Sequence, residues 1–368
     1  MIRWREGIVE TVGTRWSGAV EVTCRCADAT VRSLAYPALV GEPAVGDRVL
    51  LNTTALAMGL GTGGYAMVVA IPDRLPEDPL PAPGHLVKAR YTPLQATVLG
   101  VDEQDSPHYA ALRDADDLAG MPVVVADLHS ALPAVLAAVI ADRPGLTVAY
   151  VMTDGGALPA WFSRTVDGLR RAGWLGGTVT VGQAMGGDLE TVTLHTGLLA
   201  ARHVVGADLA VVAQGPGNLG TGTRWGFSGV AAGEAVNAAA VLGGAPVASL
   251  RVSEADPRPR HRGVSHHSLT AYGRVALAPA DVPVPMLAGS FGNVVRDQAA
   301  ALATRHRLVD VALDALYDAL LASPVRLSTM GRGLDEDPAA FLAAAAAGRH
   351  AASLVVTGRP ADALSRDG

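Results

Sequence analysis

Cysteine is scarce in this sequence, with only two in 368 residues. Cys24 and Cys26 are separated by one residue in a segment with the pattern of a strand, and we expect them to point to opposite faces of it. They are therefore not expected to form a disulfide that staples the fold, nor to supply a zinc site.

Lysine is almost absent, because Lys88 is the only one and all other Lys and Arg positions are arginine. A GC-rich genome that favours arginine codons would explain the bias and leave Lys88 to chance. The alternative is that a primary amine is needed there, since arginine cannot replace a reactive lysine. On that reading Lys88 is a candidate catalytic residue that reaches the site from the junction of two domains.

Long apolar runs are missing too. Arg202, His203 and Asp208 interrupt one candidate span, and Glu234 and Asn237 interrupt another, so no membrane partner is expected. The first residues carry charge where the apolar part of a secretory signal would begin. The net charge of −6 without a dense basic run argues against nucleic acid as the main partner. We expect a cytoplasmic protein.

Aromatic residues make up only 4% of the chain, whereas 49% is hydrophobic, so the interior must consist mainly of Ala, Val and Leu. Residues 1–71 show short strands separated by turn residues, which predicts a small all-β domain, an SH3-like or OB-like barrel. The predicted strands are 8–12, 19–24, 29–36, 47–51 and 65–71. Residues 72–84 contain five prolines and are predicted to be a linker.

Residues 85–368 alternate continuous apolar runs with helical patterns, which predicts an α/β domain with a doubly wound, mostly parallel sheet. The predicted strands are 123–126, 148–152, 179–181, 209–213 and 247–252, and the predicted helices are 130–141, 158–172, 190–204, 229–242 and 294–322. The alanine-rich segment 338–356 is expected to be a closing helix. Pairing of this helix with its copy would give a homodimer.

Polar residues follow several of these strands. Parallel sheets bind ligands at the carboxyl ends of their strands, so Asp127, His129, Asp154 and Gln214 are candidate site residues. The alternative is that such residues cap the following helices, which we favour for Ser130 and Asp188.

The segment 214–229 is the densest glycine-rich loop and lies between a predicted strand and a predicted helix. Three of its glycines match the G-x-G-x-x-G spacing, but the helix begins too late and the ribose-binding acid is misplaced for a dinucleotide. The loop instead favours an anion held by backbone amides and an arginine. A tight structural loop is the alternative. The predicted ligand-binding residues are Gln214, Gly215, Gly217, Asn218, Gly220, Thr221 and Arg224, together with Asp154.

The segment 256–268 concentrates arginines and histidines. Arg260 and His261 are predicted to neutralise a bound anion. Ser265 is predicted to cap a helix whose first turn carries His266 and His267, which would be neutral and able to transfer protons. Adjacent histidines point about 100° apart on a helix, so only one is expected to face the ligand.

A divalent metal is a further hypothesis for the same region. Asp127 and His129 form a D-x-H pair after a strand, and His261 would be their third partner. The competing interpretation, which we prefer, is that the arginines and histidines bind a phosphate or carboxylate directly.

Three segments, 84–95, 214–229 and 260–270, together resemble a bacterial family known as domain of unknown function 3866. The resemblance extends over nearly the whole chain, and it implies no particular activity.

The sequence therefore predicts an enzyme that acts on a small anionic metabolite at the strand ends. A non-catalytic ligand-binding or sensing module, or a structural subunit of an assembly, would show the same features.

Overall fold

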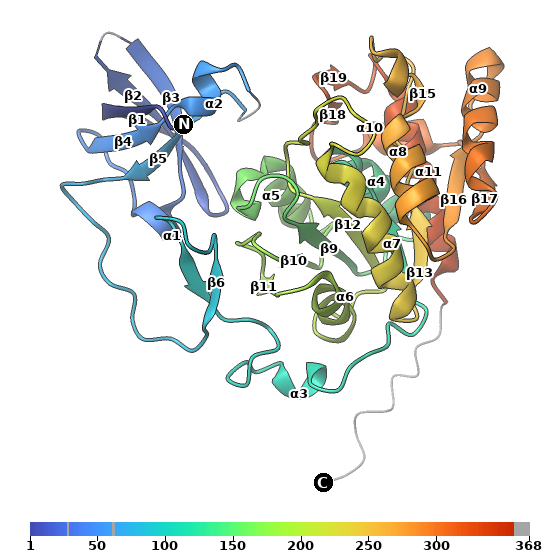
Figure 1. Ribbon diagram of the computed structural model, residues 1–368, viewed down its shortest axis with the longest axis horizontal. Coiled ribbons are helices and arrows are strands. Elements are labelled where there is room, and N and C mark those ends of the chain that lie inside the picture. Colours follow the sequence, from blue (N-terminus) through green and yellow to red (C-terminus); the bar gives the residue numbers. More distant parts are fainter. Residues whose placement is uncertain (28, 61–62, 357–368) are drawn as a thin grey trace.

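The computed structural model describes residues 1–27, 29–60 and 63–356. Figure 1 shows two parts, a barrel of the first strands (blue) and a larger α/β part that contains the parallel sheet and the helices around it. The predicted architecture is confirmed, because a closed five-stranded barrel precedes an eight-stranded sheet with flanking helices.

The barrel contains strands in the order β1-β2-β3-β5-β4, and β1 closes it by pairing with β4. This order, with β3 parallel to β5, is that of the OB-fold. Its elements are β1 (Trp4–Trp16), β2 (Ala19–Cys26), β3 (Ala29–Ala35), α1 (Pro37–Val40), β4 (Arg48–Asn52), α2 (Thr54–Ala57) and β5 (Ala66–Ala70).

The expectation that the two cysteines of β2 point to opposite faces is wrong. Cys24 and Cys26 are both buried in the barrel core, whereas Arg25 between them is exposed. Strand side chains alternate with a period of two, so residues two apart share a face.

The α/β part is built on one parallel sheet with the order β11-β10-β9-β12-β8-β13-β16-β17. The strands at its centre are apolar on both faces, because helices cover both sides. The strands are β8 (Pro122–Val125), β9 (Val148–Thr153), β10 (Gly177–Thr180), β11 (Leu189–Glu190), β12 (Leu209–Gln214), β13 (Ala245–Ala248), β16 (Asp281–Pro285) and β17 (Arg307–Val311).

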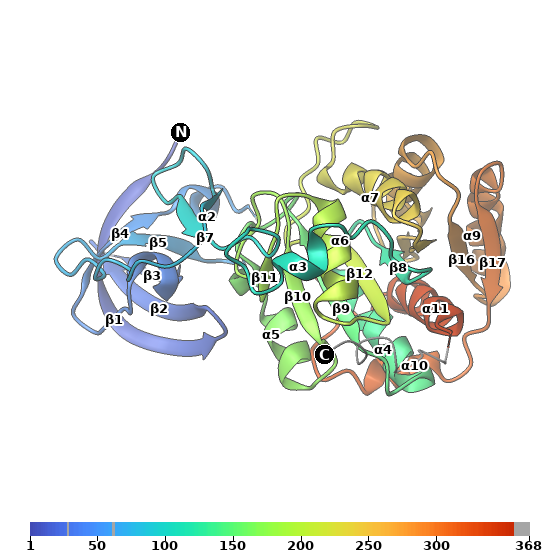
Figure 2. The ribbon, with the colours of Figure 1, turned by 90° about the horizontal axis from the view of Figure 1, so that it is seen from below.

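Helices form one layer on each face of this sheet, which makes the fold doubly wound (Figure 2). One layer holds α4 (Leu132–Asp142), α5 (Arg164–Arg171), α10 (Leu316–Leu321) and α11 (Pro338–Leu354). The other holds α6 (Leu194–His203), α7 (Ala231–Val241), α8 (His266–Thr270), the π-helix η5 (Ala271–Val275) and α9 (Gly289–Ala299). Because most residues of α11 are buried against α4 and the sheet, this helix offers little surface for the expected homodimer.

The predicted helix over 294–322 is wrong. This region contains the end of α9, the strand β17 and the short helix α10. In addition, none of the predicted strands covers β16, which carries Pro283 and Pro285. Prolines two apart place their missing N–H groups on the same side of a strand. This fits the pairing of β16, which joins β17 through five residue pairs and β13 through one.

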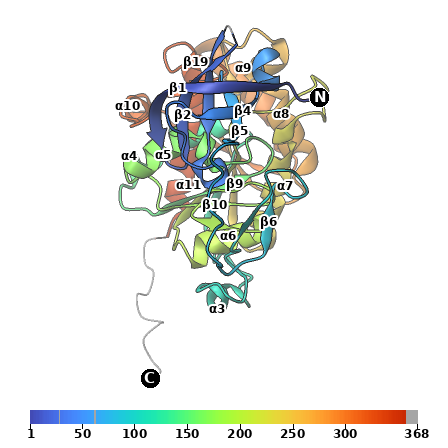
Figure 3. The ribbon, with the colours of Figure 1, turned by 90° about the vertical axis from the view of Figure 1, so that its left-hand side faces the viewer.

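The barrel packs against the α/β part beside α5 (Figure 3). The Trp16 indole donates to the backbone oxygen of Trp161 at 2.6 Å, and Arg164 donates to Glu21 and Tyr65 of the barrel. The predicted linker, residues 72–84, contains no helix or strand and leads into a hairpin of β6 (Leu86–Lys88) and β7 (Ala96–Val98), then α3 (Tyr109–Leu112). In the described part of the chain, no helix has the length and apolarity needed to cross a membrane.

Candidate functional site

The candidate site lies at the carboxyl end of the central strand β8. The chain leaves β8 toward α4 on one face of the sheet, whereas it leaves the neighbours β12 and β13 toward α7 and α8 on the other face. Diverging connections of this kind open crevices beyond the strand ends. Asp127, two residues after β8, lines two small pockets there and is 4% exposed.

The segment after β13 folds back on itself and brings histidines next to this position. Its strands β14 (Val252–Ser253) and β15 (Gly263–Val264) form an antiparallel pair. Ser265 caps α8, as predicted, by accepting a hydrogen bond from the backbone N–H of His267 at 3.2 Å. Ser268 accepts another from the backbone N–H of Arg251. These bonds fix His267 beside Arg251, whose Nη1 donates to the His267 Nδ1 at 3.1 Å.

Three imidazoles meet at this point. The ring centroids of His261, His266 and His267 are 4.4 to 4.9 Å apart, and one ring nitrogen of each lies within 4.8 Å of the others. The expectation that only one of the adjacent histidines faces the site is therefore wrong. His266 and His267 occupy the first two positions of a helix of five residues, and the centroid of each ring lies 4.9 Å from that of His261.

Burial and positive neighbours keep two of these imidazoles neutral. Burial, with Arg251 as the next cause, lowers the pKa of His261 to about 3. Burial and the adjacent His267 lower the pKa of His266 to about 4. The His261 Nδ1 shares a 2.8 Å hydrogen bond with Ser265. A neutral imidazole has a free lone pair, which is what both proton acceptance and metal ligation require.

Unsatisfied polar atoms gather around the same strand ends. Within the described part of the chain, the buried side-chain atoms without a hydrogen-bond partner are Asp127 Oδ2, Gln214 Oε1 and His266 Nε2. Buried polar atoms in folded proteins nearly always have partners, so an exception needs a cause. The Asp127 Oδ2 has only longer contacts, at 3.6 Å to the His267 Nδ1 and 3.7 Å to the Arg251 Nη1. Asp127 connects the residues that carry these atoms, because its backbone oxygen accepts from Gln214 and its side chain faces His267, the neighbour of His266.

The predicted glycine-rich loop joins this group. Gln214 donates to the backbone oxygen of Asp127 at 2.8 Å and to the side chain of Asn218 at 3.0 Å. The helical turn that follows the loop approaches β8 so closely that a Cβ on Gly229 would lie 2.9 Å from the Asp127 Cβ. Gly217 has a φ of 93°, which favours glycine. Gly215 abuts the backbone of Ala157, and Gly220 and Thr221 form the base of the exposed tip of the loop.

Beside the histidines runs an open groove with a basic lining. Arg224, Arg260, Arg274 and His266 line it, and none of the residues that line it is acidic. All three arginines are exposed, and no acidic group in the described ranges pairs with them. Two of them, Arg224 and Arg260, were predicted from the sequence. Guanidinium groups pair with phosphate and carboxylate groups through parallel N–H donors.

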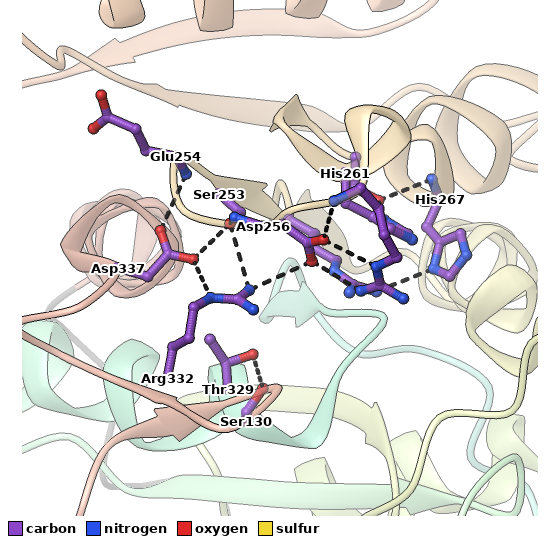
Figure 4. Close-up of polar contacts among 12 residues, drawn as sticks. Ser130, Ser253, Glu254, Asp256, His261, His267, Thr329, Arg332 and Asp337 are labelled. Atoms are coloured by element: carbon purple, nitrogen blue, oxygen red, sulfur yellow. Dashed lines mark hydrogen bonds and ion pairs between the residues drawn. The ribbon is translucent and has the colours of Figure 1, made fainter.

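On the other side of β14, a buried network of ion pairs supports the segment that carries the histidines. Figure 4 shows the Arg332 guanidinium between the carboxylates of Asp337 and Asp256. Arg332 Nε lies 3.0 Å from Asp337, which also accepts from Ser253 at 2.5 Å. Hydrogen bonds from Arg258 hold the pKa of Asp256 well below its usual range. Sequence reasoning missed Arg332 and Asp337, because they lie about eighty residues beyond Ser253 and no local motif marks them.

The structure does not bring Lys88 or Asp154 to the histidines. The Lys88 Nζ is buried, donates to the backbone oxygens of Gly182 and Thr191 at 2.9 Å, and pairs with Glu190 at 3.3 Å. These contacts lie at β11, five strand spacings or roughly 24 Å from β13. Asp154 accepts from the backbone N–H of Gln183 beside the same edge.

His129 is also separated from the other predicted metal ligands. Its Nδ1 lies 3.0 Å from the Tyr150 hydroxyl and its Nε2 lies 2.8 Å from Ser163. Both ring nitrogens are therefore used in the layer that contains α4 and α5. Of the set predicted to hold a metal, Asp127 and His261 remain at the site, and His266 and His267 join them.

The comparisons with known proteins agree with the resemblance found in the sequence. No curated protein matches the chain. A family model described as "Protein of unknown function (DUF3866)" matches residues 32–348, which span part of the barrel and nearly all of the α/β part. The chain therefore belongs to the DUF3866 family.

Proposed function

We propose that this protein is a cytoplasmic enzyme that acts on a small phosphate- or carboxylate-bearing metabolite. The observation that carries the proposal is the groove of three unpaired arginines directly beside a buried cluster with unsatisfied polar atoms. The groove attracts and orients the anion, and the cluster supplies the reactive groups. His266 belongs to both, because it lines the groove and its Nε2 is buried without a partner.

Charge and burial indicate separate roles for the arginines and for His266. Arg224, Arg260 and Arg274 bind the anion as forks of N–H donors in water-exposed positions, so salt should weaken binding. A proton or a ligand at the buried His266 Nε2 would lie next to the bound molecule, because His266 lines the groove. Phosphate and carboxylate groups share this recognition chemistry, and the groove suits both.

The test measures binding and turnover separately. Thermal unfolding is followed with inorganic phosphate, pyrophosphate and succinate. An anion at one hundred times its Kd should stabilise the protein by about 2.7 kcal/mol. The double variant R224A/R260A should lose that stabilisation, whereas R113A, which removes an exposed arginine paired with Asp114, should keep it. No stabilisation by any anion would overturn the proposal.

Catalysis is tested with His266→Gln. A panel of phosphate esters and carboxylates is incubated with the protein, and products are followed by mass spectrometry. The variant should bind the stabilising anion as the unaltered protein does and lose turnover at least tenfold. Binding without turnover of any compound by the unaltered protein would make it a binding or sensing module instead.

A further inference from the structure

We propose that His261, His266 and His267 form a binding site for a divalent transition metal, with Zn²⁺ as the best match, and that Asp127 is the outer carboxylate of this site. The inference concerns the same place as the proposed function but stands without it, because its test measures metal rather than turnover. If the metal is present, a water bound to it would supply the reactive group in place of a histidine that transfers a proton directly.

The first argument is the convergence of three imidazoles. One ring nitrogen from each residue lies within 4.8 Å of the other two. Zn–N bonds of 2.0–2.1 Å in a tetrahedral site require nitrogens roughly 3.3 Å apart, so rotations of the side chains would close the remaining distance. Three histidines around one ion leave a fourth position open, which is the arrangement of catalytic rather than structural zinc sites.

The second argument is the unsatisfied carboxylate. A histidine that binds zinc through one ring nitrogen usually donates the other N–H to a carboxylate or carbonyl oxygen. Asp127 Oδ2 lies 3.6 Å from the His267 Nδ1, is buried, and has no hydrogen-bond partner in the described part of the chain. Binding of a metal through the His267 Nε2 would place the proton on Nδ1, which would then give up the hydrogen bond that it accepts from Arg251 and donate to Asp127 instead. The same logic applies to His261, whose Nδ1 faces the Ser265 hydroxyl at 2.8 Å.

The third argument concerns charge, because the arginines near the histidines would repel a dication unless carboxylates lie beside them. Arg251 contacts Asp127 at 3.7 Å, and Arg258 pairs with Asp256 at 2.8 Å, so both of these arginines next to the histidines have a carboxylate beside them. Arg260 has no acidic partner among the described residues and lies on the groove that His266 also lines. The open position of the metal would face this groove, where an anion would contact both the metal and Arg260.

The experiment uses the full chain without an affinity tag, stripped of metal with a chelator. Titration with Co²⁺ should give one equivalent of bound metal and the intense visible absorption of a tetrahedral complex, and Zn²⁺ should displace it. His266→Gln should lower the affinity for Zn²⁺ at least tenfold. This variant removes no hydrogen bond of the His266 Nε2, because that atom has none with any residue that the structure describes. Asp127→Asn should lower the affinity by about 10- to 100-fold.

The matched control is His195→Gln, which alters an exposed histidine on α6 and should bind like the unaltered protein. Thermal unfolding of each metal-free variant shows that the comparison is made on folded protein. Absence of stoichiometric Co²⁺ or Zn²⁺ binding, or equal affinity in His266→Gln and His195→Gln, would overturn the inference. Anion binding without metal binding would remove this inference alone and leave the proposed function standing.

Discussion

The phenyl ring of Phe227 lies parallel to the imidazole of His267, with an interplanar angle of 4° and ring centroids 3.7 Å apart. Phe227 lies near the end of the glycine-rich loop, and His267 is the second residue of α8. This contact therefore joins the two segments that the sequence marks as candidate site loops. The stack also fixes one face of the imidazole, which leaves its edge to contact Arg251 and Asp127.

Substitution of Phe227 tests the strength of this contact. Phe227→Leu keeps an apolar side chain and loses the stacked ring, and should lower the free energy of unfolding by about 1 kcal/mol. Phe227→Ala also leaves a cavity and should cost about 3–5 kcal/mol. Urea denaturation measures both. Leu219→Ala, at a position that is 70% exposed in the same loop, should stay within about 0.5 kcal/mol of the unaltered protein. Equal losses in the two alanine variants would refute the role of the stack.

Lys88 gives a prediction that separates a structural role from a catalytic one. Lys88→Met removes two hydrogen bonds and leaves the Glu190 carboxylate buried without its cation, which should cost about 3–5 kcal/mol. Burial lowers the pKa of Lys88 and raises that of Glu190, because it disfavours both charges. The attraction between the two groups acts in the opposite direction. The double variant K88M/E190Q should recover part of the loss. Anion binding by folded K88M should equal that of the unaltered protein, because β11 is remote from the groove. A stable K88M variant with impaired anion binding would instead support the hypothesis that Lys88 takes part in the site.

The course of the chain through the sheet was largely predictable. The central strands are buried on both faces and therefore read as continuous runs of Val and Ala, such as 123–125 and 209–213. The outer strands β16 and β17 are not of this kind. Two prolines occupy β16, and β17 is half exposed with charged residues at 307 and 310, so neither shows the apolar run of a central strand.

The candidate site was predictable only where it is local in sequence. Asp127 follows a strand, Gln214 ends one, and the histidines share one segment beyond a strand, so the strand-end rule identifies them. Arg332 and Asp337 act from β19 (Arg332–Gly333) and the start of α11, and only tertiary folding brings them to Ser253. Lys88 is a candidate because it is the only lysine, but a bias in codon usage explains a single lysine as well as a chemical requirement does. His129 was singled out for its spacing from Asp127, which does not reveal that its ring turns toward Tyr150.

Arg332 is expected to be the residue on which the buried ion network depends. Arg332→Met leaves Asp337, which is fully buried, without its guanidinium partner and should lower the free energy of unfolding by about 3–5 kcal/mol. R113A removes an exposed pair and should cost at most about 1 kcal/mol. Guanidinium chloride denaturation at neutral pH makes the comparison. Similar losses in the two variants would show that the network contributes no more than a surface pair.

The same network predicts how stability changes in acid. Hydrogen bonds from Arg258 depress the pKa of Asp256 in the folded protein, whereas an unfolded aspartate titrates near pH 3.9. A depressed folded pKa contributes stability that is complete above about pH 4 and is lost as the pH falls toward the folded pKa, at about 1.4 kcal/mol per pH unit for one proton. Asp256→Asn lacks this contribution at every pH. Its free energy of unfolding should therefore lie below that of the unaltered protein at pH 7, and the difference should shrink between pH 4 and pH 2. Asp114→Asn, which alters the exposed partner of Arg113, should follow the unaltered protein throughout. A difference between Asp256→Asn and the unaltered protein that stays constant in acid would show that Asp256 stabilises the fold through packing rather than through its charge.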